Sequence, residues 1–557
     1  MPRPKIRFMN VQTDKKDSLP AAVVLHSTDP APEMEATHSG VVNWLVVLTA
    51  VLLTRFGWAP AFLSTDTVNL AYALESFDPV RHQPHPPGYP LFVGFARLIH
   101  LFSPNAEVTF WIISVAVTIA AAAVLYFLAN RMISRWGALA AVILFLLNPV
   151  FWFTRLYSPL LPWLALFSLL VAYCAWRCWN GERRFALYGA VALGVGTGFR
   201  PDLLGYLLPL WAVSAWIATR SWKVMIQGGL IIAGLSAVWF GIVVYAMGGI
   251  ASTVQTITTY IQEQSRSDSV LFAESLRTWL RPISRLVIWN AMALVGWIWA
   301  PIIGYRWISA KNVPWKFLLV WVAPGLAFQV FVHVASPGHT LFATPVWCLT
   351  GAFFISAMGR YRNAILAIAA IVNAALFGNV VPLGYAASPQ APPLEKAWIS
   401  LRNSIAYGTF ETSQDQLRWW DETTEVSIQE LSRFSPLDRP NVVVALNGND
   451  TEFDFVNWRV LSYYMDHQPL WVLSDHLPPG QFGRIRLVRG KDGQLSQGAT
   501  ITLPRSGRVL WVMQQNGRFH RSLERVIPVS RGRHILYSDI PPDAGSFEIE
   551  GFQFVPE

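Results

Sequence analysis

The sequence predicts an α-helical polytopic membrane protein with about eleven transmembrane helices and a C-terminal extracytoplasmic soluble domain of α/β or β-rich type. Of its 557 residues, 53% are hydrophobic and only 14% are charged, whereas about a quarter are charged in an ordinary soluble protein. The 26 Trp and 33 Phe fit a bundle with aromatic residues at both lipid–water interfaces. Near residue 390 the composition changes to that of a soluble domain.

Apolar runs of spanning length define the expected helices. The first, Val41 to Ala61, is too long for a typical signal-peptide core, so we expect it to remain as an anchor. The polar residues 1–38 before it show no periodicity and are expected to form a disordered cytoplasmic tail. A transmembrane domain at 39–388 then contains a first outer loop at about 60–107. The further runs lie at approximately 108–130, 136–153, 157–179, 185–200, 203–219, 224–247, 284–305, 317–334, 340–358 and 363–384.

The net charge of +9 is explained by membrane topology. Lys and Arg are enriched in short cytoplasmic loops, and with a cytoplasmic N-terminus every inside loop is basic. These basic residues are Arg131, Arg135, Arg177, Arg183, Arg184, Arg220, Lys223, Arg306, Lys311, Lys316, Arg360 and Arg362. They form no stripe of the kind that binds nucleic acid, so we expect no such partner. An odd number of spans places the C-terminus outside.

The C-terminal domain is expected at 389–557. Asn441–Leu446 and Leu470–Leu473 have the pattern of strands that flank a helix at about 455–465, and Arg508–Met513 resembles another strand. The triplet Asn449-Asp450-Thr451 matches a glycosylation sequon, but such triplets arise often by chance.

Polar chemistry concentrates in the first outer loop, beginning with Asp66. If residues 65–77 form a helix, Asn69 and Phe77 share the face of Asp66 and Glu75 lies opposite, so Asp66 is the lone acid of that face. A carboxylate at the membrane boundary can act as a general base or orient an acceptor hydroxyl. The alternative is a helix N-cap or an exposed interfacial acid.

A second polar group follows in His82-Gln83-Pro84-His85-Pro86-Pro87-Gly88-Tyr89-Pro90. The prolines stiffen this loop, and a rigid backbone can hold His85 and Tyr89 in a fixed geometry for substrate binding. The alternative is a plain turn with histidines exposed to water, which we prefer for His82.

Further candidates lie at outer helix ends. Arg200 is followed by Pro201 and Asp202, and could form a structural ion pair with Asp202 or clamp a phosphate. His339 and Arg155 mark two other ends. In a single bundle these ends could surround the same cavity as Asp66, although an interfacial role explains each residue alone.

No cofactor is assigned and no residue is assigned as a metal ligand, but histidine is a common ligand and the sequence leaves a divalent cation open. There is no His-Glu-x-x-His pattern. Cys174, Cys178 and Cys348 lie in apolar segments, where buried small hydrophobes explain them better than a metal pair. Because a Walker A sequence and an Asp-x-Asp near the loop are both missing, a soluble nucleotide donor is not supported.

In the order of these features, the sequence resembles the GT-C superfamily of polytopic membrane glycosyltransferases, particularly bacterial relatives of protein O-mannosyltransferases and aminoarabinose transferases. The resemblance covers about residues 40–385 and rests on Asp66, on His85–Phe92, on Phe199–Asp202 and on the succession of spans ending in an outer domain. Where relatives place a second acid beside the first, this chain has Thr67.

The resemblance implies transfer of a hexose or pentose from a polyprenyl-phosphate-linked donor to a protein, lipid or glycan acceptor, on the outer face of a bacterial inner membrane. It makes Asp66 the catalytic residue. The substrate-binding residues expected around it are His85, Tyr89, Arg200, Asp202, His339 and Arg155. Two other functions stay open: a transporter or flippase for a lipid-linked glycan, which the lack of a clear internal repeat disfavours, and a non-catalytic assembly subunit.

Overall fold

The computed structural model describes residues 48–49, 51, 59–271, 276–303, 313–332, 336–378, 392–397, 411–435, 438–447, 456–465, 468–474, 480–482, 485–491, 494–495 and 500–557. These all belong to one compact unit, Val46–Glu557. The expected tail at 1–38, most of the first apolar run and the sequon at Asn449 lie outside the described residues.

Helices dominate the described part of the chain up to residue 377, and each expected apolar run from 108–130 onward overlaps at least one of them. Their bounds are α2 Thr65–Glu75, η1 Pro79–Arg81 (a 3₁₀ turn), α3 Pro90–His100, α4 Ala106–Met132, α5 Arg135–Leu146, α6 Pro149–Tyr157, α7 Pro162–Trp179, α8 Phe185–Phe199, α9 Leu203–Thr219, α10 Trp222–Ala246, α11 Ile250–Asp268, α12 Leu276–Leu294, α13 Trp299–Ile303, α14 Trp315–Phe331, η3 Pro337–Phe342, α15 Thr344–Ser356, η4 Gly359–Tyr361 and α16 Arg362–Phe377.

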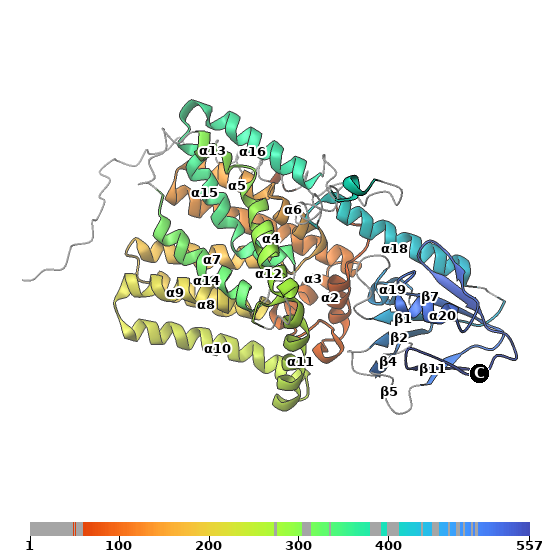
Figure 1. Ribbon diagram of the computed structural model, residues 1–557. Helices are drawn as coiled ribbons and strands as arrows, with labels where there is room; N and C mark the ends of the chain where they lie inside the picture. Colours follow the sequence, from red (N-terminus) through yellow and green to blue (C-terminus); the bar gives the residue numbers. More distant parts are fainter. Residues whose placement is uncertain are drawn as a thin grey trace, which may run out of the picture. The chain divides into compact units, whose positions relative to one another are not determined.

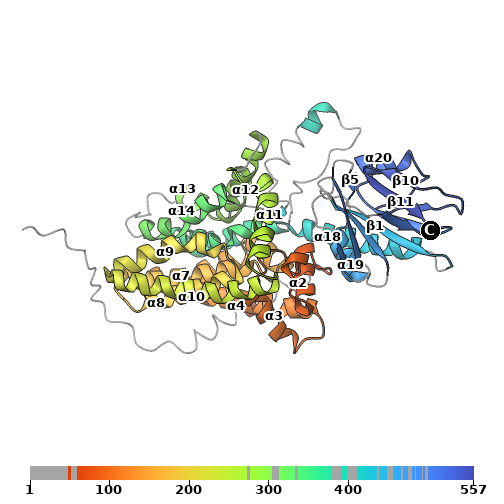
Figure 2. The ribbon, with the colours of Figure 1, turned by 90° about the horizontal axis from the view of Figure 1, so that it is seen from below.

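Within the described ranges, four helical segments are long and apolar enough to cross a membrane: α4, α7, α10 and Gly359–Phe377. The pair α5 and α6 raises this number to five if it counts as one bent span. Of the shorter apolar helices, α8 and α9 pack against α7 and α10, α15 packs against α5, and α14 packs against α9. Figures 1 and 2 both show α7, α8, α9 and α10 side by side.

The boundary expected between the runs at 136–153 and 157–179 lies elsewhere in the structure, and the first run contains a bend. The helix bends by 56° between α5 and α6. Asn148 caps α6, because its Oδ1 accepts a hydrogen bond from the backbone N–H of Phe151 at 3.1 Å, and Pro149 suits the first helical position, where no N–H is needed. Tyr157 therefore ends α6, and α7 begins only at Pro162.

The C-terminal residues add a mixed sheet. Strand order is β3-β4-β2-β1-β7-β9-β8, with β1 parallel to both β2 and β7, and a separate three-stranded sheet has the order β10-β11-β6. The bounds are α18 Gln414–Phe434, β1 Asn441–Asn447, α19 Trp458–Tyr464, β2 Leu470–Ser474, β3 Gly480–Phe482, β4 Ile485–Lys491, β5 Gln494–Leu495, β6 Thr500–Leu503, β7 Arg508–Val512, α20 Arg518–Glu524, β8 Ser530–Arg531, β9 Leu536–Asp539, β10 Phe547–Ile549 and β11 Phe552–Pro556.

Both faces of β1 are buried, which explains its unbroken apolar sequence. Alternate side chains point to opposite faces of a strand. Val442 and Val444 accordingly join one hydrophobic cluster, whereas Val443 and Ala445 join another. The second cluster also contains Val68 of α2, so the sheet and the first outer loop share a core.

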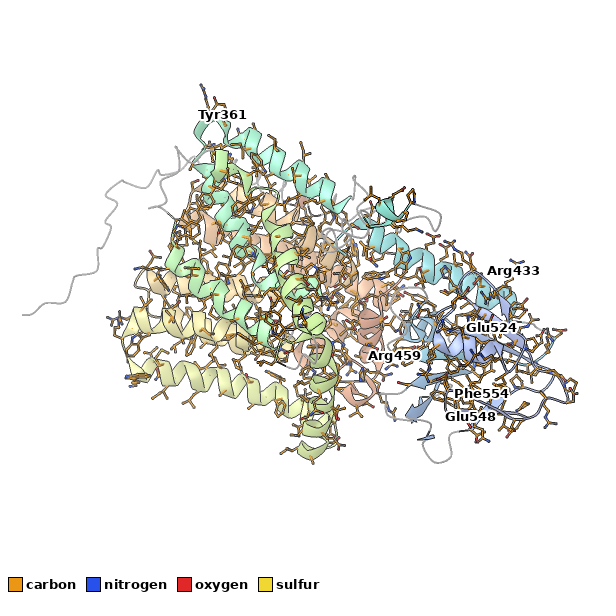
Figure 3. The ribbon with its side chains drawn as sticks, viewed as in Figure 1. Tyr361, Arg433, Arg459, Glu524, Glu548 and Phe554 are labelled. Atoms are coloured by element: carbon orange, nitrogen blue, oxygen red, sulfur yellow. The ribbon has the colours of Figure 1, made fainter. Side chains whose placement is uncertain are left out.

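Hydrogen bonds reinforce this junction. The Asp421 carboxylate accepts from the backbone N–H groups of Ala61 at 2.8 Å and Phe62 at 3.1 Å. Arg459 of α19, labelled in Figure 3, donates from Nη2 to the carbonyl oxygen of Arg81. Burial lowers the pKa of Arg459 to about 10. Residues far apart in the sequence therefore hold the loop that carries the candidate site.

Candidate active site

Asp66 lies in the first turn of α2, and its side chain is 74% exposed while most of the helix is buried. Ser64 occupies the N-cap position, so the N-cap alternative for Asp66 is wrong. The helix ends at Glu75 instead of Phe77, since Ser76 is extended. Thr67 fixes the turn by donating from Oγ1 to the carbonyl oxygen of Tyr157 at 2.8 Å. Asp66 is thus an exposed carboxylate on an anchored helix.

Behind Asp66 lie the half-buried His85 and the buried Tyr89. The distance from Asp66 Oδ1 to His85 Nδ1 is 3.9 Å, and His85 Nε2 lies 2.9 Å from Tyr89 Oη. Burial lowers the pKa of His85, although the charge of Asp66 acts in the opposite direction, and burial also raises the pKa of Tyr89. A neutral imidazole that accepts from the Tyr89 hydroxyl carries its proton on Nδ1, facing Asp66.

The backbone of this loop depends on Gly88, whose φ is +102°. A Cβ at this position would lie 2.8 Å from Pro79 Cγ and 3.0 Å from Phe77 Cζ. Only glycine reaches this conformation without strain and leaves room for those two rings. The next residue, Tyr89, is also left-handed, at φ 47°, and begins α3 as its N-cap. His82, at φ 58°, ends the turn η1.

Arg200 and Asp202 continue the series of contacts that begins with His85 and Tyr89, and these four residues are called the polar chain below. The Arg200 Cζ atom lies 5.3 Å from the centre of the Tyr89 ring, within range of a cation–π interaction. Arg200 Nε and Nη2 donate to the two carboxylate oxygens of Asp202 at 3.1 and 2.8 Å, and Tyr206 Oη donates to Asp202 at 3.3 Å. The ion pair that the sequence allowed is therefore present, and Arg200 is only 6% exposed.

His339 and Arg155 are also buried, in η3 and α6 respectively. The carbonyl oxygen of His339 accepts from Gln329 Nε2 at 2.6 Å. Arg155 lines a small cavity of about 70 Å³ together with Thr67, Glu107 and Tyr157. Arg155 therefore lies beside the anchored turn of α2.

A pocket of about 400 Å³ opens beside Asp66. Its lining combines the outer loop with the C-terminal elements: Pro60, Phe62, Leu63, Ser64, Thr65, Asp66, Tyr157, Trp419, Trp420, Asp421, Thr423, Thr424, Val456, Asn457 and Val460. Of the site residues expected from the sequence, Asp66 alone is among them; His85, Tyr89, Arg200 and Asp202 extend behind it as a chain of contacts. The wall formed by α18 was not expected from the sequence, where its local signal is a Trp-Trp-Asp triplet in a polar helix.

The described residues contain no group of three or more His, Cys, Asp or Glu side chains placed to hold a metal ion. Cys174, Cys178 and Cys348 are free thiols in the buried helical core.

The sequence matches no protein-family model and no curated protein. The fold is similar to that of ArnT from Cupriavidus metallidurans in the apo state, with a TM-score of 0.54, 14% identity, and coverage of 90% of this chain and 97% of that chain. The same protein bound to undecaprenyl phosphate gives a TM-score of 0.55 at 13% identity, covering 90% and 98%. Archaeal oligosaccharyltransferase AglB from Archaeoglobus fulgidus is matched more loosely, with a TM-score of 0.37 at 11% identity over 77% of this chain and 63% of that one, and supports no conclusion.

At such low identity the likeness concerns the fold alone, and it fits the helical membrane fold expected from the sequence.

Proposed function

We propose that this chain is a membrane glycosyltransferase that moves a sugar from a polyprenyl-phosphate-linked donor to a protein, lipid or glycan acceptor. In this proposal about eleven spans cross a bacterial inner membrane, the N-terminus is cytoplasmic, and the C-terminal domain lies outside. The similarity in fold to ArnT, which has been captured with undecaprenyl phosphate, supports the donor class. The long apolar helices support the membrane setting.

One observation carries the proposal: an anchored, 74% exposed carboxylate borders a pocket of about 400 Å³ and is backed by the polar chain. In the proposed step, the acceptor oxygen attacks the anomeric carbon of the sugar and the bond from that carbon to the phosphate oxygen breaks. The bonding pair leaves with the polyprenyl phosphate. The acceptor proton passes to the carboxylate of Asp66, as general-base catalysis requires.

The other candidate residues take supporting parts in the proposal. His85, held by Tyr89, orients the Asp66 carboxylate electrostatically across the 3.9 Å between Nδ1 and Oδ1. The guanidinium of Arg200 is held in place by its ion pair with Asp202, and in the proposal it acts as a preorganised donor toward the departing phosphate. His339 and Arg155 would contribute to the same stabilisation of the phosphate from neighbouring helix ends.

The test compares Asp66→Asn with Glu75→Gln in purified protein supplied with a panel of polyprenyl-phosphate sugars. Glu75 is a matched control because it is an exposed acid on the same helix. We expect Asp66→Asn to reduce sugar transfer by about 10²–10⁴-fold, the usual contribution of a general base, and Glu75→Gln to retain it. Full transfer by Asp66→Asn would remove Asp66 from the chemistry. Movement of the lipid across vesicles without cleavage would favour a transporter.

A further inference from the structure

The pocket beside Asp66 has two tryptophans from α18 in its wall, and they differ in their surroundings. The Trp420 ring packs against Phe153 at 5.8 Å and Tyr157 at 5.5 Å, so it belongs to the structural junction with α6. The Trp419 ring is half-buried and, among the described residues, contacts no other aromatic ring. Because Trp419 lines the pocket without such a ring contact, it is the tryptophan left to meet a molecule there.

The polar groups of the pocket also differ in which of their hydrogen-bonding atoms already have a partner in the protein. Both oxygens of Asp421 already accept backbone N–H groups, so this carboxylate is part of the wall. Asn457 uses its Oδ1 to cap α19, where it accepts from the backbone N–H of Arg459 at 2.8 Å. None of the described residues accepts a hydrogen bond from Nδ2 of Asn457, and its amide hydrogens complement the acceptor oxygens of Asp66.

We propose that this pocket binds a sugar ring, stacked on Trp419 and hydrogen-bonded to Asn457. A pyranose or furanose presents an apolar C–H face and a rim of hydroxyls, and the pocket presents an aromatic face beside an amide donor and a carboxylate acceptor. Its volume of about 400 Å³ lies in the usual range for small-ligand sites. The inference rests on the proposed function, since it names the substrate class bound beside Asp66.

The ring could belong to the donor lipid or to a glycan acceptor, and transfer kinetics separate these sources. In Trp419→Ala, a raised KM for the polyprenyl-phosphate sugar identifies the donor, and a raised KM for the acceptor glycan identifies the acceptor. Unchanged values of both would overturn the inference.

A binding measurement that needs no turnover keeps this inference separate from the proposed function. Saturation-transfer NMR on the purified full chain would use methyl glycosides of common hexoses and pentoses as probes. We expect Trp419→Ala to weaken binding of the recognised glycoside about tenfold, the scale of one lost aromatic stacking contact. Trp419→Phe, which keeps an aromatic face, should retain most of the binding. Trp222→Ala, at a 70% exposed tryptophan of α10, is the control for removing an indole elsewhere.

A second variant tests whether a loss of binding could result from misfolding alone. Asn457→Asp keeps an oxygen to cap α19 but loses the amide donors, and Asp caps helices as well as Asn does. It should therefore fold normally and weaken glycoside binding. If the wild type binds no glycoside, or if Trp419→Ala and Asn457→Asp bind as the wild type does, the sugar site is wrong. If binding depends on Trp419 but no sugar is ever transferred, the sugar site stands and the glycosyltransferase proposal fails.

Discussion

Replacing Tyr89 by phenylalanine tests whether the polar chain behind Asp66 contributes to catalysis. The change removes one hydroxyl, and with it the 2.9 Å hydrogen bond to His85 Nε2, but it keeps the ring beneath Arg200. Burial lowers the pKa of His85, which favours the neutral imidazole and opposes relief of the loss by protonation. Its Nε2 atom becomes an acceptor without a donor.

Leaving such a group unsatisfied costs about 1–3 kcal/mol. The imidazole can escape part of this cost by moving its proton to Nε2, but a lone pair on Nδ1 would then face the Asp66 carboxylate at 3.9 Å. If the full penalty appears in the transition state, turnover falls by about 5- to 150-fold. Neither His85 nor Tyr89 lines the pocket, so the KM values should change by less than about threefold.

The assay is the initial rate of sugar transfer at varied donor and acceptor concentrations, with melting temperature measured in parallel. Tyr188→Phe is the matched control, since Tyr188 is 54% exposed on α8. A folded Tyr89→Phe enzyme with wild-type kcat would refute a positioning role for this pair. So would a rise in KM at constant kcat, because it would mean that Tyr89 binds substrate directly.

Gly88→Ala should lower the melting temperature, since a side chain at φ +102° and within 3 Å of its neighbours costs about 1–3 kcal/mol. The control, Gly94→Ala on the open side of α3, should be neutral or stabilising by up to about 1 kcal/mol. Equal melting temperatures of the two variants would contradict the strain argument. His520 is fully buried and burial lowers its pKa from the usual 6.5, so the unfolded chain takes up the proton first as pH falls below that value and the folded state loses stability. Melting of wild type and His520→Gln at about pH 7.5 and about pH 5.5 should show a smaller acid-induced fall in the variant, and parallel falls would mean that His520 does not titrate as argued.

Local patterns predicted much of the helical fold because a helix is the main way to satisfy backbone hydrogen bonds within a lipid bilayer. Runs of apolar residues therefore located α4, α8, α9 and α10 closely. The same reasoning missed the bend at Asn148, because counting apolar residues ignores the capping side chain that stops one helix and starts the next. Asn148 followed by Pro149 is a local sequence signal for such a helix start.

The site itself was predictable only in part. Asp66, His85 and Tyr89 share one loop, so their clustering could be expected from the sequence, and their contacts are present. The opposite wall of the pocket comes from α18 and α19. Asp421 bonds to Ala61 across 360 positions of sequence, and no periodicity within either segment reports such a pairing. Trp419 was missed for the same reason.

The pocket wall formed by α18 and α19 also determines how the first outer loop is held in place. Arg459 is buried in α19, and its guanidinium lies 4.7 Å from the Trp458 ring and 5.6 Å from the Tyr72 ring. A buried cation needs compensation, and here two aromatic faces and the Arg81 carbonyl provide it. Arg81 lies in η1, between Asp66 and His85 in the chain. The distance between the carboxylate and the imidazole therefore depends on α19 as well as on the rigid loop, and C-terminal residues belong to the site although the resemblance in sequence stopped before them.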